Sequence, residues 1–511
     1  MNINKPVRRV RTRYAPSPTG FQHIGGIRTA LYCYLFAQKH HGDFILRIED
    51  TDQSRYVEEA EDYLVEALKW CGIHYSEGIH VGGKHAPYRQ SERKPLYIRY
   101  AKQLLESGHA YYAFDTPEEL EAMRNRATHS QYGALTRMDM CNSLTLPPDE
   151  VLARLEAETP YVIRLCIPPD EYVTVHDLVR GAVTVNSNEL DDKVLMKSDG
   201  MPTYHLANVV DDYLMEITHV IRGEEWLPST PLHVLLYRFL GWEHVMPAFA
   251  HVPLMLNPDG KGKLSKRNGD RYGFPVFPLA WHNKSTDEKA NGFREMGFLP
   301  EAFINMLAFF GWNPGTDQEL FSLPQLIDAF SIERISKSGA KFDFDKAKWF
   351  NQQYLKAMSN DELAQISLSI DKQHKAFGKD ATYLAKTFGL MKERISFVSE
   401  IWTQGAYFFS PDFAYDEKVV ASKWKRERVP FFQYLDSQLG CLAQWEEADI
   451  EECTKNTAKE HQLGLGEVLP LLRVMLTGIT SGPSVFGTAA LLGKTQTSER
   501  IHKFMKQNAF L

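Results

Sequence analysis

The chain has 511 residues, of which 43% are hydrophobic and 24% are charged, and its formal net charge is −7. This balance is typical of a folded protein and excludes a disordered chain, and the length favours about three or four domains. No apolar run reaches the roughly 20 residues that cross a bilayer, and the basic N-terminal stretch leads into no apolar signal core. We therefore expect a cytoplasmic protein.

The cysteines indicate the same compartment. None of the six lies within three residues of another, and the sequence has no CxxC pair and no cluster of cysteine and histidine. This spacing is unlike that of a zinc site or a disulfide framework, and it fits a reducing environment. We expect no zinc and no metal-ligating side chains.

The first hundred residues alternate between strand and helix patterns. An apolar, β-prone run at 10–14 precedes a turn-rich stretch at 15–20, and helical periodicity follows at 27–40. Residues 44–48 are typical of a buried strand that ends in acidic residues, and a second helix is predicted at 56–70. Strand, crossover helix and strand in this order indicate a parallel, doubly wound sheet.

The rest of the chain changes character several times. A mixed α+β stretch interrupts the alternating pattern, which then returns, and strand signals become rare toward the C-terminus. We predict the first half of a Rossmann-like nucleotide-binding core at 1–93, an inserted α+β domain at 94–203 and the second half of the core at 204–257. A segment with a basic loop follows at 258–344, and an all-α region at 345–511.

Two short motifs are candidates for chemistry. In PSPTGFQHIGG at 16–26, Gly25 and Gly26 open the predicted helix, whose N-terminus favours anions, and His23 can donate a hydrogen bond to a phosphate. In KGKLSKR at 261–267, Lys263 and Lys266 can stabilise the charge of a departing pyrophosphate. Taken alone, the first motif is also typical of a surface turn and the second of an exposed basic loop.

The two motifs together resemble the paired signatures of class I aminoacyl-tRNA synthetases. More specifically, successive blocks of the sequence resemble those of bacterial glutamyl-tRNA synthetases, in the same order and at similar spacing. The blocks are RTRYAPSPTG, HIGG, ILRIEDTD, HAPYRQSERKPLY, KSDGMPTYHLANVVDD, VIRGEEWLPSTPLHVLLY, KLSKR, LPLLRVMLTG and GPSVFGTAALLGK. This resemblance covers nearly the whole chain. It implies that 94–203 binds the acceptor stem of tRNA, that 258–344 contacts the stem and that 345–511 binds the anticodon.

The resemblance also implies the site residues. Arg13 and Arg222 supply the positive charge that selects glutamate, and a guanidinium suits a carboxylate because it can form two parallel hydrogen bonds. The other residues expected at glutamate are Ala15, Ser17, Glu49, Tyr204 and Asn208. The residues expected at ATP are His23, Gly25, Gly26, Glu225, Trp226, Lys263, Leu264, Ser265 and Lys266, of which His23, Lys263 and Lys266 are the expected catalytic groups.

By the same resemblance, the enzyme is expected to use ATP, as Mg-ATP, to form glutamyl-adenylate and to transfer the glutamyl group to tRNA(Glu). No side-chain nucleophile is needed, because catalysis rests on positioning and charge stabilisation. Two departures from the family pattern stand out. Gly26 occupies the position of the second histidine of the HIGH motif, and the segment 272–292 is longer than in many relatives. For this segment we expect packing, with contact to tRNA as the alternative.

Several alternatives remain open from the sequence. The nearest is a non-discriminating enzyme that also charges tRNA(Gln) with glutamate. A nucleotidylyltransferase that shares the HIGH-type fold needs no helical tail, and a non-catalytic tRNA-binding protein leaves His23, Lys263 and Lys266 without a reason to occur together. We expect a monomer that does not associate with membranes.

Overall fold

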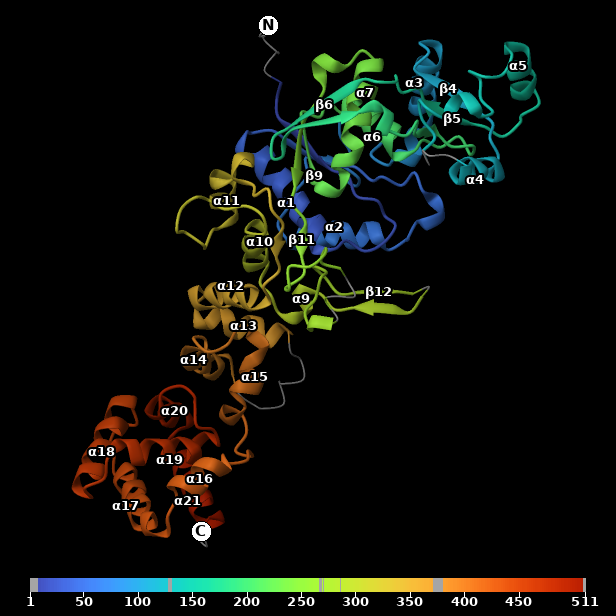
Figure 1. Ribbon diagram of the computed structural model, residues 1–511. Helices are drawn as coiled ribbons and strands as arrows, with labels where there is room; N and C mark the ends of the chain where they lie inside the picture. The colour runs from blue at the N-terminus through green and yellow to red at the C-terminus, as the bar shows by residue number, and fades with distance from the viewer. Residues whose placement is uncertain are drawn as a thin grey trace. The chain divides into compact units, whose positions relative to one another are not determined.

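The computed structural model describes residues 8–126, 131–265, 269, 271–284, 286–370 and 380–508 (Figure 1). The chain divides into two compact units. The first contains residues 1–296 and 300–344, and the second contains residues 297–299 and 345–511. In the described parts of the chain, every strand belongs to the first unit, and the second consists of helices and their connections.

A seven-stranded sheet in the order β3–β2–β1–β9–β10–β6–β7 forms the centre of the first unit. Its strands are β1 (Arg11–Tyr14), β2 (Asp43–Leu46), β3 (Glu77–Gly78), β6 (Tyr172–Asp177), β7 (Gly181–Asn186), β9 (His219–Gly223) and β10 (Ala248–Val252). All neighbours are parallel except the hairpin of β6 and β7. The strand order reverses between β1 and β9, and in such sheets ligands bind outside the carboxyl ends of the strands at the reversal.

Helix α1 (Ile24–Lys39) connects β1 to β2 and packs against β1, β2 and β9. It begins three residues before the predicted helix at 27–40, because His23 caps it: the Nδ1 atom of His23 accepts a hydrogen bond from the backbone N–H of Gly25 at 3.1 Å. The predicted strand at 44–48 is β2, and the predicted helix at 56–70 is α2 (Ala60–Trp70). The motif turn is thereby fixed at the carboxyl end of β1.

The segment 94–203 contributes to two sheets. A separate three-stranded sheet contains β4 (Ala110–Ala113), β5 (Val162–Leu165) and β8 (Val194–Met196), and the helices of this segment are α3 (Lys94–Glu106), α4 (Pro117–Arg126) and α5 (Pro148–Glu156). Strands β6 and β7 extend the core sheet instead, because β6 pairs with β10. The predicted α/β core with an inserted α+β part is confirmed. The pairing of β6 with the core is a long-range contact that no local sequence pattern indicates.

The remaining elements of the first unit follow the core strands. They are α6 (Tyr204–Leu214), α7 (Thr230–Phe239), β11 (Met255–Leu256), β12 (Trp281–Asn283), β13 (Glu288–Ala290), α9 (Phe293–Met296), α10 (Pro300–Ala308), α11 (Leu323–Ala329) and β14 (Ala340–Lys341).

The segment 272–292 packs on the motif turn. The backbone N–H of Ile24 donates to the carbonyl of Val276 at 2.9 Å, and the rings of Phe21 and Trp281 stack with centroids 4.4 Å apart. These contacts hold the residues on both sides of His23, so this segment braces the start of α1.

The second unit confirms the predicted helical C-terminal region. Its helices are α12 (Phe344–Ala357), α13 (Asn360–Ile370), α14 (Ala381–Met391), α15 (Ile401–Gln404), α16 (Glu417–Lys423), α17 (Val429–Gly440), α18 (Glu447–Glu460), α19 (Leu465–Thr477), α20 (Val485–Leu492) and α21 (Lys494–Gln507). Apolar side chains from most of them, such as Phe388, Leu435, Leu472 and Ile501, are buried in one core. Across the described residues of both units, none of the helices combines the length and apolarity that a membrane span requires.

Candidate functional site

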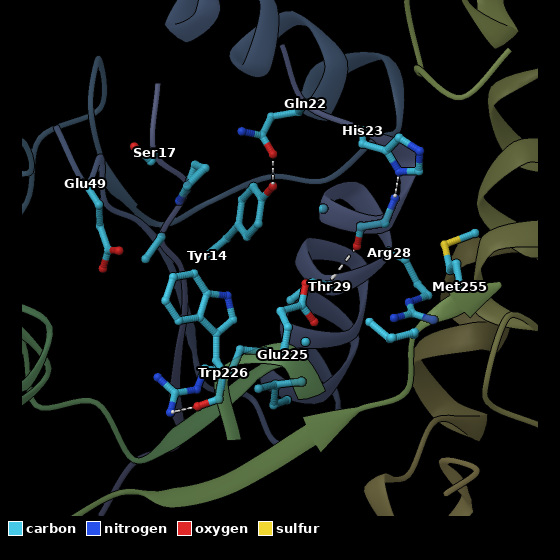
Figure 2. Close-up of a pocket in the computed structure, with 18 of the residues that line it drawn as sticks. Tyr14, Ser17, Gln22, His23, Arg28, Thr29, Glu49, Glu225, Trp226 and Met255 are labelled. Carbon is cyan, nitrogen blue, oxygen red and sulfur yellow. Dashed lines mark hydrogen bonds between the residues drawn. The ribbon is translucent and has the colours of Figure 1, made fainter. Parts of the chain in front are cut away.

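A cavity of about 490 Å³ lies at the carboxyl ends of the strands where the strand order reverses. Figure 2 shows Ser17 and Glu49 at one side of it and His23, Arg28 and Met255 at the other, with Glu225 and Trp226 between them. Of the residues expected from the sequence, the cavity is lined by Arg13, Ala15, Ser17, His23, Gly25, Gly26, Glu49, Tyr204, Asn208, Arg222, Glu225, Trp226, Lys263, Leu264 and Ser265. Lys266 lies outside the described residues.

Arg13, near the end of β1, is held by a buried carboxylate. Its Nε atom lies 3.0 Å from Oδ1 and 3.3 Å from Oδ2 of Asp212, on α6. Neither Nη atom of Arg13 has a hydrogen-bond partner among the described residues, and the side chain lines the cavity. Burial disfavours the charge on Arg13, but the contacts with Asp212, together with the nearby charge of Glu49, raise the pKa of the guanidinium overall. Arg13 therefore presents a charged set of N–H donors to the cavity.

Arg47 connects Asp212 to Glu49. Arg47 is fully buried and donates from Nη1 to Asp212 Oδ1 at 2.8 Å and from Nη2 to Glu49 Oε1 at 3.2 Å. Asn208, also on α6, donates to the same Glu49 oxygen at 3.1 Å. Burial raises the pKa of Glu49 although Arg47 and Arg13 act against it. Glu49 is thus a carboxylate at the cavity wall that a substrate ammonium would stabilise.

Arg222, near the end of β9, makes a different set of contacts. Its Nε donates to His251 Nε2 at 3.0 Å, its Nη1 to Tyr204 Oη at 2.5 Å, and its Nη2 to Thr230 Oγ1 at 2.9 Å and to the carbonyl of Trp226 at 3.3 Å. None of these acceptors carries a charge. Burial therefore lowers the pKa of Arg222 and favours the entry of an anion beside it.

The imidazole of His23 is neutral and carries its single ring proton on Nε2. Burial lowers the pKa of His23 to about 4, and the positive charges of Lys263 and Arg28 act in the same direction. Because Nδ1 accepts the hydrogen bond from Gly25, the ring proton lies on Nε2, which has no partner among the described residues. The neutral imidazole thus caps the N-terminus of α1, where a phosphate is favoured.

Comparison with known proteins identifies the family to which the chain belongs. Residues 9–349 match the model of the catalytic domain of class I tRNA synthetases (E and Q), and residues 352–505 match the model of an anticodon binding domain. The chain belongs to the class I tRNA synthetases. The glutamate–tRNA ligase of Phocaeicola vulgatus is 52% identical, with 97% of this chain and 98% of that protein covered. The glutamate–tRNA ligase of Cytophaga hutchinsonii is 51% identical, with 97% and 96% covered.

A solved structure agrees with the sequence comparisons. The crystal structure of a glutamate tRNA ligase from Elizabethkingia meningosepticum in complex with its amino acid has a TM-score of 0.93 to this chain and 47% sequence identity. The alignment covers 98% of this chain and 99% of that one. The resemblance to glutamyl-tRNA synthetases that the sequence blocks indicated is confirmed.

In this synthetase a pair of side chains occupies the place next to Gly26. A Cβ atom at residue 26 would lie 2.6 Å from Tyr14 Oη and 2.7 Å from Gln22 Oε1, and these two side chains are hydrogen-bonded to each other at 2.8 Å. A second histidine in the motif would collide with this pair. A side chain at position 26 would have to displace the ends of Tyr14 and Gln22, both of which line the cavity and were not predicted as site residues.

The basic loop is anchored by its backbone, whereas the side chain of Lys263 makes an exposed ion pair. The backbone N–H of Leu264 donates to the carbonyl of Met255 at 2.8 Å, which fixes the loop beside β11. Lys263 Nζ lies 2.7 Å from Glu225 Oε1, and both side chains are exposed. An exposed ion pair contributes about 1 kcal/mol or less, so a nucleotide phosphate can compete for Lys263.

The aromatic wall of the cavity comes from Tyr204 and Trp226. Their ring centroids are 4.5 Å apart, and Trp226 keeps 42% of its surface exposed, which is unusual for a side chain of this size. Three buried residues that were not predicted as site residues support the cavity's side chains: Arg47, Asp212 and His251. Their role depends on contacts between distant segments, which the sequence alone does not display.

Proposed function

We propose that this chain is a glutamate–tRNA ligase that activates glutamate with ATP and transfers it to the 3′ end of tRNA(Glu) for protein synthesis. The observation that carries the proposal is one cavity with two kinds of donor. Arg13 and Arg222 line one side with their N–H groups, and the N-terminus of α1, capped by His23, lies at the other. The first set suits a carboxylate and the second a phosphate. The names of the relatives support the same substrate.

At the amino-acid side, Arg13, Arg222 and Tyr204 would bind the side-chain carboxylate of glutamate. Burial raises the pKa of Tyr204 to about 12, so the hydroxyl keeps its proton and can donate it to an anion. Glu49 would accept hydrogen bonds from the α-ammonium group, held in place by Arg47 and Asn208. The remaining expected contacts, Ala15 and Ser17, line the cavity beside them.

At the nucleotide side, ATP enters as Mg-ATP, and no resident metal is needed. The phosphates would lie at the N-terminus of α1, with the Nε2–H of His23 as a donor. Gly25, Gly26, Glu225, Trp226, Leu264 and Ser265 are the further contacts we propose for ATP. Lys263 and Lys266 would stabilise the pyrophosphate as negative charge develops on it.

The reaction then needs no nucleophile from the protein. The α-carboxylate of glutamate attacks the α-phosphorus of ATP, and the bond to pyrophosphate breaks to give glutamyl-adenylate. A hydroxyl of the terminal ribose of tRNA attacks the activated carbonyl, so that the ester forms, AMP leaves and the hydroxyl proton is released. The cavity contributes by aligning the two substrates and by fixing donors where charge develops.

The tRNA would be recognised by both units. The match of residues 352–505 to an anticodon binding domain supports anticodon reading by the helical unit. We propose that 94–203 binds the acceptor stem, that 258–344 contacts the stem, and that the enzyme acts as a cytoplasmic monomer. No observation on the chain favours tRNA(Gln) as a second substrate, and charging of that tRNA is an outcome of the test below.

The test is transfer of radiolabelled glutamate to purified tRNA(Glu) and, separately, to tRNA(Gln). Lys266→Ala should lower the rate of tRNA charging by at least about a hundredfold. Lys69 is an exposed lysine on α2, and Lys69→Ala should charge tRNA at the wild-type rate. Charging of tRNA(Glu) alone supports a discriminating enzyme, and charging of both moves it to the relaxed class. If a folded wild-type protein charges neither, the proposal is wrong, and a nucleotidylyltransferase becomes the better hypothesis.

A further inference from the structure

Three buried polar side chains, Asp177, His251 and Arg222, are hydrogen-bonded in series across the core sheet. Asp177, the last residue of β6, lies with Oδ2 2.6 Å from Nδ1 of His251 on β10. The other ring nitrogen of His251, Nε2, accepts from Nε of Arg222 on β9 at 3.0 Å. All three side chains are almost fully buried, with Asp177 and Arg222 5% exposed and His251 0% exposed. The three residues come from three adjacent strands of the sheet.

The hydrogen bonds fix the tautomer of His251. The Nε atom of Arg222 carries a proton at all accessible pH values, so His251 Nε2 must act as the acceptor. The proton of the neutral imidazole therefore lies on Nδ1, where Asp177 Oδ2 accepts it. The Asp177 carboxylate is held in turn by the backbone N–H groups of Val179 and Arg180, at 2.9 and 2.8 Å from Oδ1. The carboxylate thus determines which nitrogen of His251 faces Arg222.

The same contacts determine which donor Arg222 offers to a ligand. A guanidinium has five N–H donors. The Nε donor is used by His251, both Nη2 donors by Thr230 and the carbonyl of Trp226, and one Nη1 donor by Tyr204. The second Nη1 donor has no partner in the described part of the chain. Tyr204 accepts from Arg222, so its own O–H is also available, and these two neighbouring donors belong to side chains that line the cavity.

We propose that Asp177 and His251 are positioning residues that lock Arg222 in the orientation that selects a carboxylate over a carboxamide. This inference rests on the proposed function, in which Arg222 binds the side chain of glutamate. If His251 carried its proton on Nε2, that proton would face the Nε–H of Arg222, and the guanidinium would have to rotate. If the guanidinium rotates, its Nη1–H no longer points at the Tyr204 hydroxyl. This part of the cavity then presents hydrogen-bond acceptors to a ligand as well as donors. A carboxamide, which needs an acceptor for its NH₂ group, is then rejected less strongly.

The experiment measures steady-state activation of glutamate and of glutamine, with ATP and tRNA(Glu) present, for matched variants of the full chain. His251→Phe removes the acceptor for Arg222 and keeps the ring volume. His251→Gln keeps an acceptor near the position of Nε2 that does not depend on Asp177. Asp177→Asn removes the charge that fixes the tautomer. His219→Phe is the matched control, because His219 is a largely buried histidine on β9 that faces Thr218 and Phe36 rather than the cavity.

We expect His251→Phe and Asp177→Asn to raise the KM for glutamate by about tenfold or more, with the KM for ATP changed by less than about twofold. The preference for glutamate over glutamine in kcat/KM should fall by a similar factor. His251→Gln should restore most of the affinity for glutamate and most of the preference for it. The double variant His251→Gln/Asp177→Asn should have nearly the same KM and preference as His251→Gln alone. His219→Phe should leave all of these values near those of the wild type.

The variant Arg222→Ala shows whether a negative result contradicts the inference or the proposed function on which it rests. If Arg222→Ala abolishes use of glutamate but the variants at 177 and 251 keep the wild-type KM and preference, Arg222 binds glutamate without this support. If Arg222→Ala also leaves glutamate use unchanged, the proposed glutamate site itself is wrong. Should His251→Phe fail to fold, the comparison of Asp177→Asn in the wild-type and His251→Gln backgrounds decides: equal losses in both contradict the inference.

Discussion

The two arginines of the cavity are supported in opposite ways. Each is held through its Nε atom by an acceptor from a neighbouring element, at 3.0 Å in both cases. For Arg13 the acceptor is the carboxylate of Asp212, whereas for Arg222 it is the neutral ring of His251. The carboxylate raises the pKa of Arg13, and burial without an adjacent anion lowers the pKa of Arg222. The charge of Arg13 is therefore compensated by the protein, and that of Arg222 is left for the ligand.

This difference separates structural stability from affinity. Compensating a buried charge stabilises the fold but reduces the attraction that the charge exerts on a substrate. An uncompensated buried charge costs stability and attracts an anion strongly in the low dielectric of the interior. We therefore expect substitutions around Arg13 to act mainly on folding, and substitutions around Arg222 to act mainly on glutamate binding.

The largest effect on stability is expected for Asp212→Asn. This change leaves Arg13 and the fully buried Arg47 without the carboxylate that both contact, and breaking a buried ion pair costs about 3–5 kcal/mol. Urea unfolding measures the loss, and Asp52→Asn, which removes an exposed ion pair with Arg55, is the control for which we expect a much smaller loss.

The loss at Asp212 also has a predicted pH dependence. Arg13 and Arg47 overcome the effect of burial and hold the pKa of Asp212 below its usual range. Its contribution is thus present at neutral pH and is lost as the pH falls through this lowered pKa. The difference in stability between the wild type and Asp212→Asn should therefore shrink on acidification. A difference that is the same at neutral and strongly acidic pH contradicts the assignment of the effect to this ion pair.

The second prediction concerns Arg222, where we expect a large loss of glutamate affinity and little loss of stability. Arg222→Met replaces an uncompensated buried charge by an apolar side chain of similar length, a change that is often neutral for folding. We expect the free energy of unfolding to change by less than about 1 kcal/mol while affinity for glutamate falls by about a hundredfold or more. Calorimetric titration with glutamate measures the second effect. A stability loss as large as that of Asp212→Asn would remove the distinction between the two arginines.

Glu49 tests whether the charge network extends to the substrate. Burial raises its pKa, so its ionised form is disfavoured in the free protein, and Glu49→Gln should leave the melting temperature equal or slightly higher. The same variant should weaken glutamate binding by about tenfold, because the proposed ion pair with the α-ammonium group is lost.

The pH dependence of binding follows from the same raised pKa. Wild-type affinity for glutamate should fall on acidification at a higher pH than an ordinary glutamate side chain would give, and this dependence should be absent in Glu49→Gln. Persistence of the acidic decline in the variant would assign it to another group.

The sequence predicted the elements of the site better than their supports. Glu49 and Arg222 lie in recognisable blocks near the ends of strands, and His23 lies at the start of the helix after β1, so their gathering at one edge of the sheet could be predicted. Asp212, Arg47 and His251 also lie in or near such blocks, yet nothing in the local pattern shows which side chain they contact. Their contacts join segments that lie 29 to 199 residues apart in the chain, such as β1 with α6 and β10 with its neighbours β9 and β6.

The fold shows the same limit. Hydrophobic periodicity located α1, β2 and the helical C-terminal region, because those signals are local. The return of β6 and β7 to the core sheet was not predictable, because an exposed hairpin and a hairpin at the edge of a larger sheet have the same alternation of side chains. That return matters for the site, since it brings Asp177 next to His251.

The smallest predicted effect concerns Thr230, which separates positioning by one hydrogen bond from positioning by the whole set. Thr230→Val is nearly isosteric and removes the Oγ1 atom, which accepts from Arg222 Nη2 at 2.9 Å and lies 3.2 Å from His251 Nε2. The carbonyl of Trp226 remains as an acceptor for the same nitrogen, so we expect the KM for glutamate to rise by only about two- to fivefold and stability to fall by about 1 kcal/mol. Steady-state kinetics beside Arg222→Met gives the comparison. If Thr230→Val matches the loss of Arg222→Met, the orientation of the guanidinium rests on Thr230 rather than on His251, and the neutral imidazole is not what distinguishes this half of the cavity from the half around Arg13.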